Sequence, residues 1–136
     1  METSDILTAG SAYESFMGRW SKVVAHEFLS WLSIPPGRRW LDVGCGTGTL
    51  NAMPLESVSP SETQGVDASE DFVAYAQSAI TDARSRFVVG DAHALPYEME
   101  GFDVGVSGLV LNLLPRPADA VAETIRVAKL GGVVAA

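Results

Sequence analysis

One segment of the chain limits the choice of fold more than any other. The apolar run Arg39–Val43 is followed directly by alternating glycines at Gly44, Gly46 and Gly48. A short apolar run closed by glycines is typical of a buried strand that turns sharply into a helix. In an open parallel sheet such a turn lies at the carboxyl end of its strand, which is where ligands bind. We therefore expect a strand–loop–helix unit with a ligand site in its loop.

Segments typical of strands and of helices alternate along the rest of the chain. Further strands are predicted at 63–66, 86–89, 102–107 and 133–136, and helices at 47–57, at 69–81 and from 117 to the glycines at 131–132. This alternation requires crossover connections and a mostly parallel sheet. We predict one doubly wound α/β domain over 1–136, with an amphipathic helix at about 12–33 and a core at 38–136.

Three finer expectations concern packing. Pro54 lies inside the predicted helix at 47–57 and should kink or shorten it. The last helix should bury a stripe at helical spacing, formed by Val121, Ile125 and Ala128. The tryptophans are expected in the core or in a lid over the site, at Trp20, Trp31 and Trp40.

Composition excludes several functions. Nine basic against seventeen acidic residues give a net charge of −8, which argues against binding a nucleic-acid backbone. The single cysteine, Cys45, and a polar amino terminus without a signal-peptide pattern favour a cytoplasmic protein. Because no apolar run approaches about 18 residues, we expect no membrane span. The two histidines and Cys45 are too far apart in sequence to indicate a metal site.

Acidic residues end three successive predicted strands. Asp42 stands two residues before the first glycine, where a carboxylate suits a ligand with an ammonium group. Asp67 follows the glycine loop at the spacing of an acid that accepts from ribose hydroxyls. Asp91 could accept from the exocyclic amine of an adenine, with the N–H of Ala92 reading the ring, or it could be a loop acid that forms an Asx turn. A nicotinamide fingerprint would place its last glycine at position 49, which is Thr49, so an NAD(P)-dependent oxidoreductase is disfavoured.

Five motifs in order along the chain carry a family resemblance. They are LDVGCGTG at 41–48, GVDAS at 65–69, GDAHALPY at 90–97, FDVGVS at 102–107 and KLGGVV at 129–134. In these motifs the chain resembles the class I S-adenosylmethionine-dependent methyltransferases, in the group that includes the ubiquinone and menaquinone biosynthesis C-methyltransferases. Members of that family have a seven-stranded sheet, and we expect this chain to be truncated after about the fifth strand. An exposed fifth strand would invite a homodimer.

The resemblance implies a cofactor, S-adenosylmethionine, and a role for ten residues. The methionine portion would lie on Gly44, Cys45 and Gly46, with Asp42 beneath its ammonium group. Asp67 would hold the ribose hydroxyls and Ala68 would pack on the adenine, whose edge Asp91 and Ala92 would read. Ser107 and Leu109 would lie near the sulfonium. Tyr13 or Arg19, on the lid helix, would reach the cofactor or the substrate.

The predicted function is methyl transfer to an unidentified small-molecule acceptor. Since the positive sulfur already activates the methyl group, proximity and orientation would supply most of the catalysis, and we assign no catalytic residue. We expect His26 to be a helix-surface residue, His93 a loop residue, and Cys45 a pocket-lining residue rather than a nucleophile. The alternative, from another functional class, is a cofactor-binding module without turnover.

Overall fold

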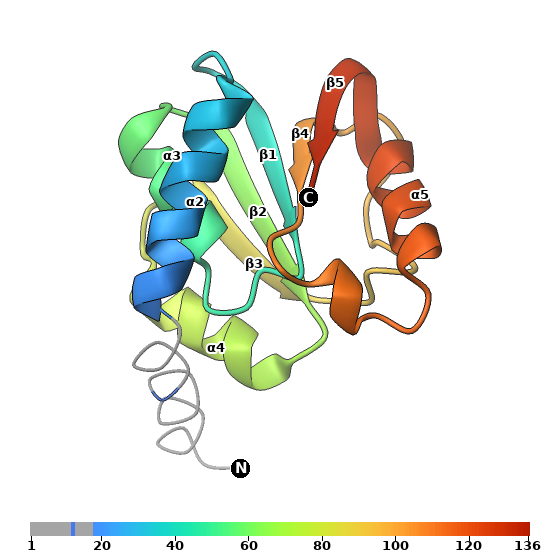
Figure 1. Cartoon of the computed structure of the whole chain (residues 1–136), viewed down its shortest axis with the longest axis horizontal. Helices are drawn as coiled ribbons and strands as arrows, with labels where there is room; N and C mark the ends of the chain where they lie inside the picture. The colour runs from blue at the N-terminus through green and yellow to red at the C-terminus, as the bar shows by residue number, and fades with distance from the viewer. Residues whose placement is uncertain (1–11, 13–17) are drawn as a thin grey trace.

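A sheet of five parallel strands forms the centre of the computed structural model (Figure 1), which describes residues 12 and 18–136. The strand order is β3-β2-β1-β4-β5, so β1 lies in the middle. The elements, in chain order, are α2 (Arg19–Leu32), β1 (Arg39–Val43), α3 (Thr49–Ser57), β2 (Glu62–Asp67), α4 (Glu70–Ala79), β3 (Ser85–Val89), β4 (Phe102–Val106), the short 3-10 helix η2 (Leu111–Leu113), α5 (Pro117–Val127) and β5 (Ala128–Ala135). The doubly wound α/β prediction is confirmed.

The strand order explains where a ligand can bind. The chain runs outward from β1 through β2 to β3, then returns to the other side of β1 to form β4 and β5. The carboxyl ends of β1 and β4 therefore lie at a topological switch point, where the loops diverge and leave a crevice. The glycine loop follows β1 at this edge of the sheet.

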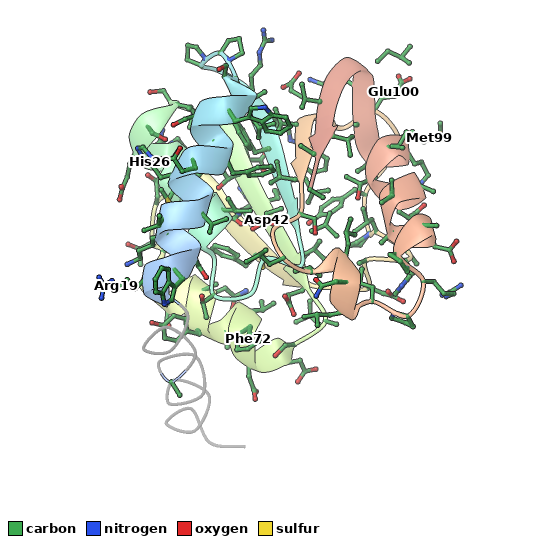
Figure 2. The ribbon with its side chains drawn as sticks, viewed as in Figure 1. Arg19, His26, Asp42, Phe72, Met99 and Glu100 are labelled. Atoms are coloured by element: carbon green, nitrogen blue, oxygen red, sulfur yellow. The ribbon has the colours of Figure 1, made fainter. Side chains whose placement is uncertain are left out.

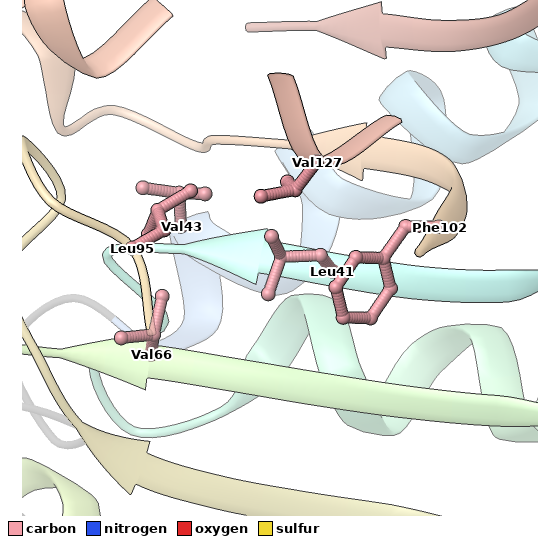
Figure 3. Close-up of a cluster of buried hydrophobic side chains, with 6 residues drawn as sticks. All are labelled: Leu41, Val43, Val66, Leu95, Phe102 and Val127. Carbon is pink, nitrogen blue, oxygen red and sulfur yellow. The ribbon is translucent and has the colours of Figure 1, made fainter. Parts of the chain in front are cut away.

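Successive side chains of β1 point to opposite faces of the sheet, and each face has its own core. One cluster contains Leu41, Val43, Val66, Leu95, Phe102 and Val127, and Figure 3 shows these side chains gathered over β1, β2 and the end of α5. On the other face, Trp40 packs with Leu29 of α2 and with Val104 and Val106 of β4. A third cluster joins α4 to β3 through Val73, Ala76 and Phe87, together with Cys45.

The structure differs from the finer packing expectations for α3 and α5. Helix α3 continues past Pro54 to Ser57, although the proline removes one backbone donor from its interior. The buried face of α5 is Ala120, Thr124 and Val127, whereas Ile125 is 58% exposed. The stripe is displaced because Gly105 on β4 leaves space for Thr124, whose methyl group lies only 2.7 Å from the site of a Cβ at Gly105.

The end of α5 and two tryptophans also differ from expectation. The helix ends at Val127, and β5 begins at once, with a register irregularity between Phe102 and Val104 of its neighbour β4. Trp40 is buried as predicted, but Trp20 and Trp31 on α2 are 64% and 72% exposed. Helix α2 packs on the sheet through Ala25 and Leu29, and the tryptophans lie on its outer side. No helix in the described part of the chain is long and apolar enough to cross a membrane.

Candidate functional site

The loop between β1 and α3 is a tight backbone turn. Gly44, Gly46 and Gly48 all have positive φ, at 74°, 54° and 94°, which glycine adopts at little cost. A Cβ on Gly44 would lie 2.6 Å from the Val110 side chain, so glycine also admits the loop that follows β4. The N–H groups of Gly44 and Cys45 both donate to the carbonyl of Val66, at 2.8 and 3.0 Å. The loop is therefore held against the end of β2.

A cavity of about 530 Å³ opens beside this loop. Its volume is in the usual range for small-molecule sites. The part nearest the strand ends contains polar groups from Asp42, Asp67 and Ser107, and the remainder is mainly apolar. The cavity brings together seven of the ten predicted site residues, namely Asp42, Gly44, Cys45, Gly46, Asp67, Ser107 and Leu109.

Asp42 is the most unusual group in the cavity wall. Its side chain lies near the centre of the molecule (Figure 2) and is only 3% exposed. Burial raises the pKa of Asp42 to about 8, and the nearby charge of Asp67 adds to the shift. Its Oδ1 atom has no hydrogen-bond partner among the described residues. A buried carboxylate oxygen without a donor favours a cationic ligand group.

Asn51 supports Asp42 from helix α3. With its amide nitrogen facing the acid, Asn51 donates to Asp42 Oδ2 at 3.2 Å and accepts from the Gly65 N–H at 3.1 Å. The side chain is fully buried. This contact leaves Oδ1 as the oxygen available to a ligand. Asn51 was not predicted as a site residue, because the sequence does not show that this polar side chain is buried against Asp42.

Asp67 holds two parts of the site together. Its Oδ2 accepts from the Gly46 N–H at 2.9 Å, and its Oδ1 accepts from the Ser69 N–H at 2.8 Å. These contacts join the glycine loop to the start of α4 and fix the orientation of the carboxylate. Each oxygen has a second lone pair that a ligand hydroxyl could use.

Cys45 and Ser107 line the cavity without features of a nucleophile. Burial raises the pKa of the Cys45 thiol, and the charges of Asp42 and Asp67 raise it further. A thiol in this state is inert. The Ser107 hydroxyl donates to the carbonyl of Val43 at 2.9 Å, which ties the end of β4 to the end of β1.

The other three predicted residues lie outside the cavity wall. Ala68 and Asp91 are exposed, and Ala92 packs against the core cluster of Figure 3. They still belong to the same edge of the sheet, because the Gly90 N–H donates to the Asp67 carbonyl at 3.0 Å. The assignment of these residues to an adenine stays a prediction.

The predicted lid is described only in part. Tyr13 lies outside the described residues, and Arg19 at the start of α2 is exposed at the molecule's edge (Figure 2). Four other α2 residues face the cavity, as does Phe72 from α4, none of which was predicted as a site residue. The α2 residues are Ser21, Val24, Ala25 and Phe28. Helical periodicity alone does not distinguish a core face from a cavity face, so the sequence pattern of α4 does not mark Phe72 as a site residue.

The two histidines lie away from the cavity wall. His26 is on the exposed side of α2, with 69% of its side chain accessible, as expected (Figure 2). His93 is in the loop after β3, but its side chain is only 9% exposed and its Nδ1 lies 2.7 Å from Asp91 Oδ1. Among the residues that the structure describes, no group of three or more histidines, cysteines and acids could hold a metal ion.

Comparison with known proteins identifies similar sequences and folds. A family model described as a methyltransferase domain matches residues 41–136. A ubiquinone/menaquinone biosynthesis C-methyltransferase of Dinoroseobacter shibae is 33% identical over 108 residues, covering 76% of this chain and 43% of that protein. A second relative, an uncharacterized 37.1 kDa protein of a Streptomyces fradiae transposon, is 37% identical over 106 residues, which cover 76% of this chain and 31% of that protein. The chain therefore spans less than half the length of these two curated relatives.

Solved structures share the fold. A methyltransferase in complex with the Haloferax volcanii Trm112 methyltransferase activator matches with a TM-score of 0.82 at 22% identity, over 93% of this chain and 54% of that chain. An S-adenosylmethionine-dependent methyltransferase from Methanococcus maripaludis matches with a TM-score of 0.80 at 23% identity, over 98% of this chain and 62% of that chain.

Proposed function

The chain belongs to the methyltransferase-domain family, and on that basis we propose that its cavity binds S-adenosylmethionine and supports methyl transfer to a small-molecule acceptor. The observation that carries this proposal is Asp42, a buried acid in the cavity wall whose Oδ1 has no donor among the described residues. The amino-acid portion of the cofactor offers an ammonium group that would supply both the missing donor and the missing charge.

The residues around Asp42 fit the rest of the cofactor. Gly46 has open space where a Cβ would stand, so a ligand can approach the backbone there. Asp67 presents a fixed carboxylate for the ribose hydroxyls. The adenine would lie beyond it, with Ala68 against its face and Asp91 and Ala92 at its edge. Ser107 and Leu109, at the end of β4, would lie near the sulfonium.

The remaining cavity wall suits an apolar acceptor. S-adenosylmethionine supplies a methyl group on a positively charged sulfur, which is already activated for displacement. The chain then has to orient the acceptor and exclude water, as proximity is the main contribution to such a reaction. Apolar side chains from α2, α3 and the loop after β4 line that side of the cavity, among them Val24, Phe28, Leu50, Val110 and Leu113.

The test is calorimetric titration of the chain with S-adenosylhomocysteine at pH 7, in two buffers of different ionisation enthalpy. Because the pKa of Asp42 is about 8, the free site holds a proton that the ligand ammonium should displace. We expect release of about one proton on binding, a linkage effect. Asp42→Asn should abolish this release and weaken binding by about 10- to 100-fold, the value of a hydrogen bond to a charged group.

The titration has two controls, one variant and one ligand. Asp82→Asn removes an acid that is paired with Arg84 at 2.8 Å and does not line the cavity, so it should bind like the unmodified chain. NAD serves as the control ligand and should give no binding heat. A folded chain that does not bind S-adenosylhomocysteine would overturn the proposal. Binding without methyl transfer to any acceptor would favour the alternative of a cofactor-binding module without turnover.

A further inference from the structure

The loop after β3 places a buried histidine against an exposed acid. His93 is 9% exposed in its side chain, whereas Asp91 is 62% exposed. The backbone N–H of His93 donates to Asp91 Oδ1 at 2.8 Å, and His93 Nδ1 lies 2.7 Å from the same oxygen. Since a carboxylate only accepts, Nδ1 carries the proton in this contact. The buried imidazole ring of His93 therefore contacts only one oxygen, Oδ1, of the exposed Asp91 carboxylate.

The backbone on both sides of this pair is anchored. The Gly90 N–H donates to the Asp67 carbonyl at 3.0 Å, and the Ala94 N–H donates to the Asp91 carbonyl at 3.0 Å. Further along, the Leu95 N–H donates to Glu123 Oε2 of α5 at 2.8 Å. With the backbone anchored, the main remaining freedom of Asp91 is the rotation of its carboxylate. The imidazole of His93 restricts that rotation.

The arrangement leaves one carboxylate oxygen for a ligand. Both contacts with His93 use Oδ1, and no described residue donates to Oδ2. The hydrogen bonds from His93 lower the pKa of Asp91, and the positive charge of Arg116 adds to this effect. Arg116 itself is paired with Asp119 at 2.9 Å. Asp91 is therefore kept ionised, with one oxygen held and the other open.

We propose that His93 is a positioning residue that holds the Asp91 carboxylate ready to accept the exocyclic amine of adenine. This inference rests on the proposed function, because it takes the ligand to be an adenosine compound. His93 would act only through Asp91. Its effect should therefore depend on the amine of the ligand and on the presence of Asp91.

The test uses titration calorimetry to compare two ligands on the unmodified chain and on four variants. The ligands are S-adenosylhomocysteine and its analogue with hydrogen in place of the exocyclic amine. His93→Ala should raise the Kd for the adenine ligand about three- to tenfold, because the Asp91 side chain must then be ordered when the ligand binds. The same variant should leave the Kd for the analogue unchanged. In an Asp91→Ala background, His93→Ala should have no further effect. His93→Asn, which keeps a donor, should restore part of the preference for the amine.

His26→Ala is the matched control, because His26 is 69% exposed and does not line the cavity. It should leave both Kd values unchanged. Equal weakening of the two ligands by His93→Ala would indicate a structural role only and would overturn the inference, as would an additive effect with Asp91→Ala. Failure of the unmodified chain to bind would instead overturn the proposed function, and this inference with it.

If His93→Ala does not fold, the unmodified chain still permits a test. Nitrogen NMR of the imidazole should show the proton on Nδ1, with a resonance that shifts when S-adenosylhomocysteine binds and shifts less with the desamino analogue. Identical shifts with the two ligands would contradict the inference.

Discussion

At the scale of single residues, Asp42 is the acid of the site whose charged form is strongly disfavoured by burial and by a neighbouring negative charge. Full burial beside Asp67 makes the ionised form of Asp42 costly, and within the described part of the chain the contact from Asn51 reaches Oδ2 while Oδ1 has no partner. Such a group stabilises nothing in the free chain when it is charged. The cationic ligand group proposed above would account for its position at the end of the central strand.

The raised pKa of Asp42 predicts how stability depends on pH. The unfolded chain releases this proton near pH 4 while the folded chain keeps it until about pH 8, so the Asp42 contribution is lost as pH rises. Asp42→Asn removes this dependence. Relative to the unmodified chain, the variant should gain about 4 kcal/mol in free energy of unfolding between pH 5 and pH 8. Urea titrations at both pH values measure the difference, with Asp82→Asn as control. Parallel pH curves for Asp42→Asn and the unmodified chain would contradict the prediction.

At the scale of elements, helix α4 starts just after Asp67, the acid that ends β2. Ser69 is its N-cap, and the Ser69 Oγ accepts from the Phe72 N–H at 3.3 Å, while Glu70 and Asp71 lie in the first turn. Serine followed by two acids is a sequence pattern typical of a helix start. The cap fixes the start of α4 and so the placement of Phe72 in the cavity wall.

Loss of this cap should destabilise the chain. Ser69→Ala should lower the free energy of unfolding by about 1 kcal/mol, because the helix loses a partner for one of its first N–H groups. Ser78→Ala, on the exposed side of the same helix, should have a much smaller effect. Urea unfolding followed by circular dichroism measures both. Equal losses in the two variants would show that the Ser69 hydroxyl does not act as a cap.

At the scale of the whole molecule, the sheet has a free edge. Strand β5 pairs with β4 and has no neighbour on its other side in the described structure (Figure 1). Its apolar residues Leu130 and Val134 are 90% and 39% exposed. An open strand with exposed apolar side chains is a template for pairing with another strand.

We predict that the 136-residue chain self-associates through this edge. Light scattering at micromolar concentration should give a mass above that of a monomer. Val134→Lys places a charge on the edge and should shift the chain to monomer, whereas Val23→Lys on the exposed side of α2 should not. A monomeric unmodified chain would rule out association through β5.

The order of elements and most of the strand-end site could be predicted because they depend on local patterns. The apolar run before the glycines fixes β1 by itself, and parallel connections bring the ends of neighbouring strands together, so Asp42 and Asp67 meet without further information. Three features could not be predicted in this way. Asn51 lies beside Asp42, Trp20 and Trp31 are exposed on α2, and His93 is buried against Asp91.

The sequence by itself determined the fold class, the glycine turn and the acids at the strand ends. Hydrophobic period, turn residues and the rule of parallel crossovers act between residues close in the chain. Only the tertiary structure decided which stripe of α2 and of α5 is buried, since both helices carry apolar residues on more than one side. That choice depends on the surface each helix meets, such as the space at Gly105 that accepts Thr124. Burial, and with it the raised pKa of Asp42, is likewise a property of the packed molecule.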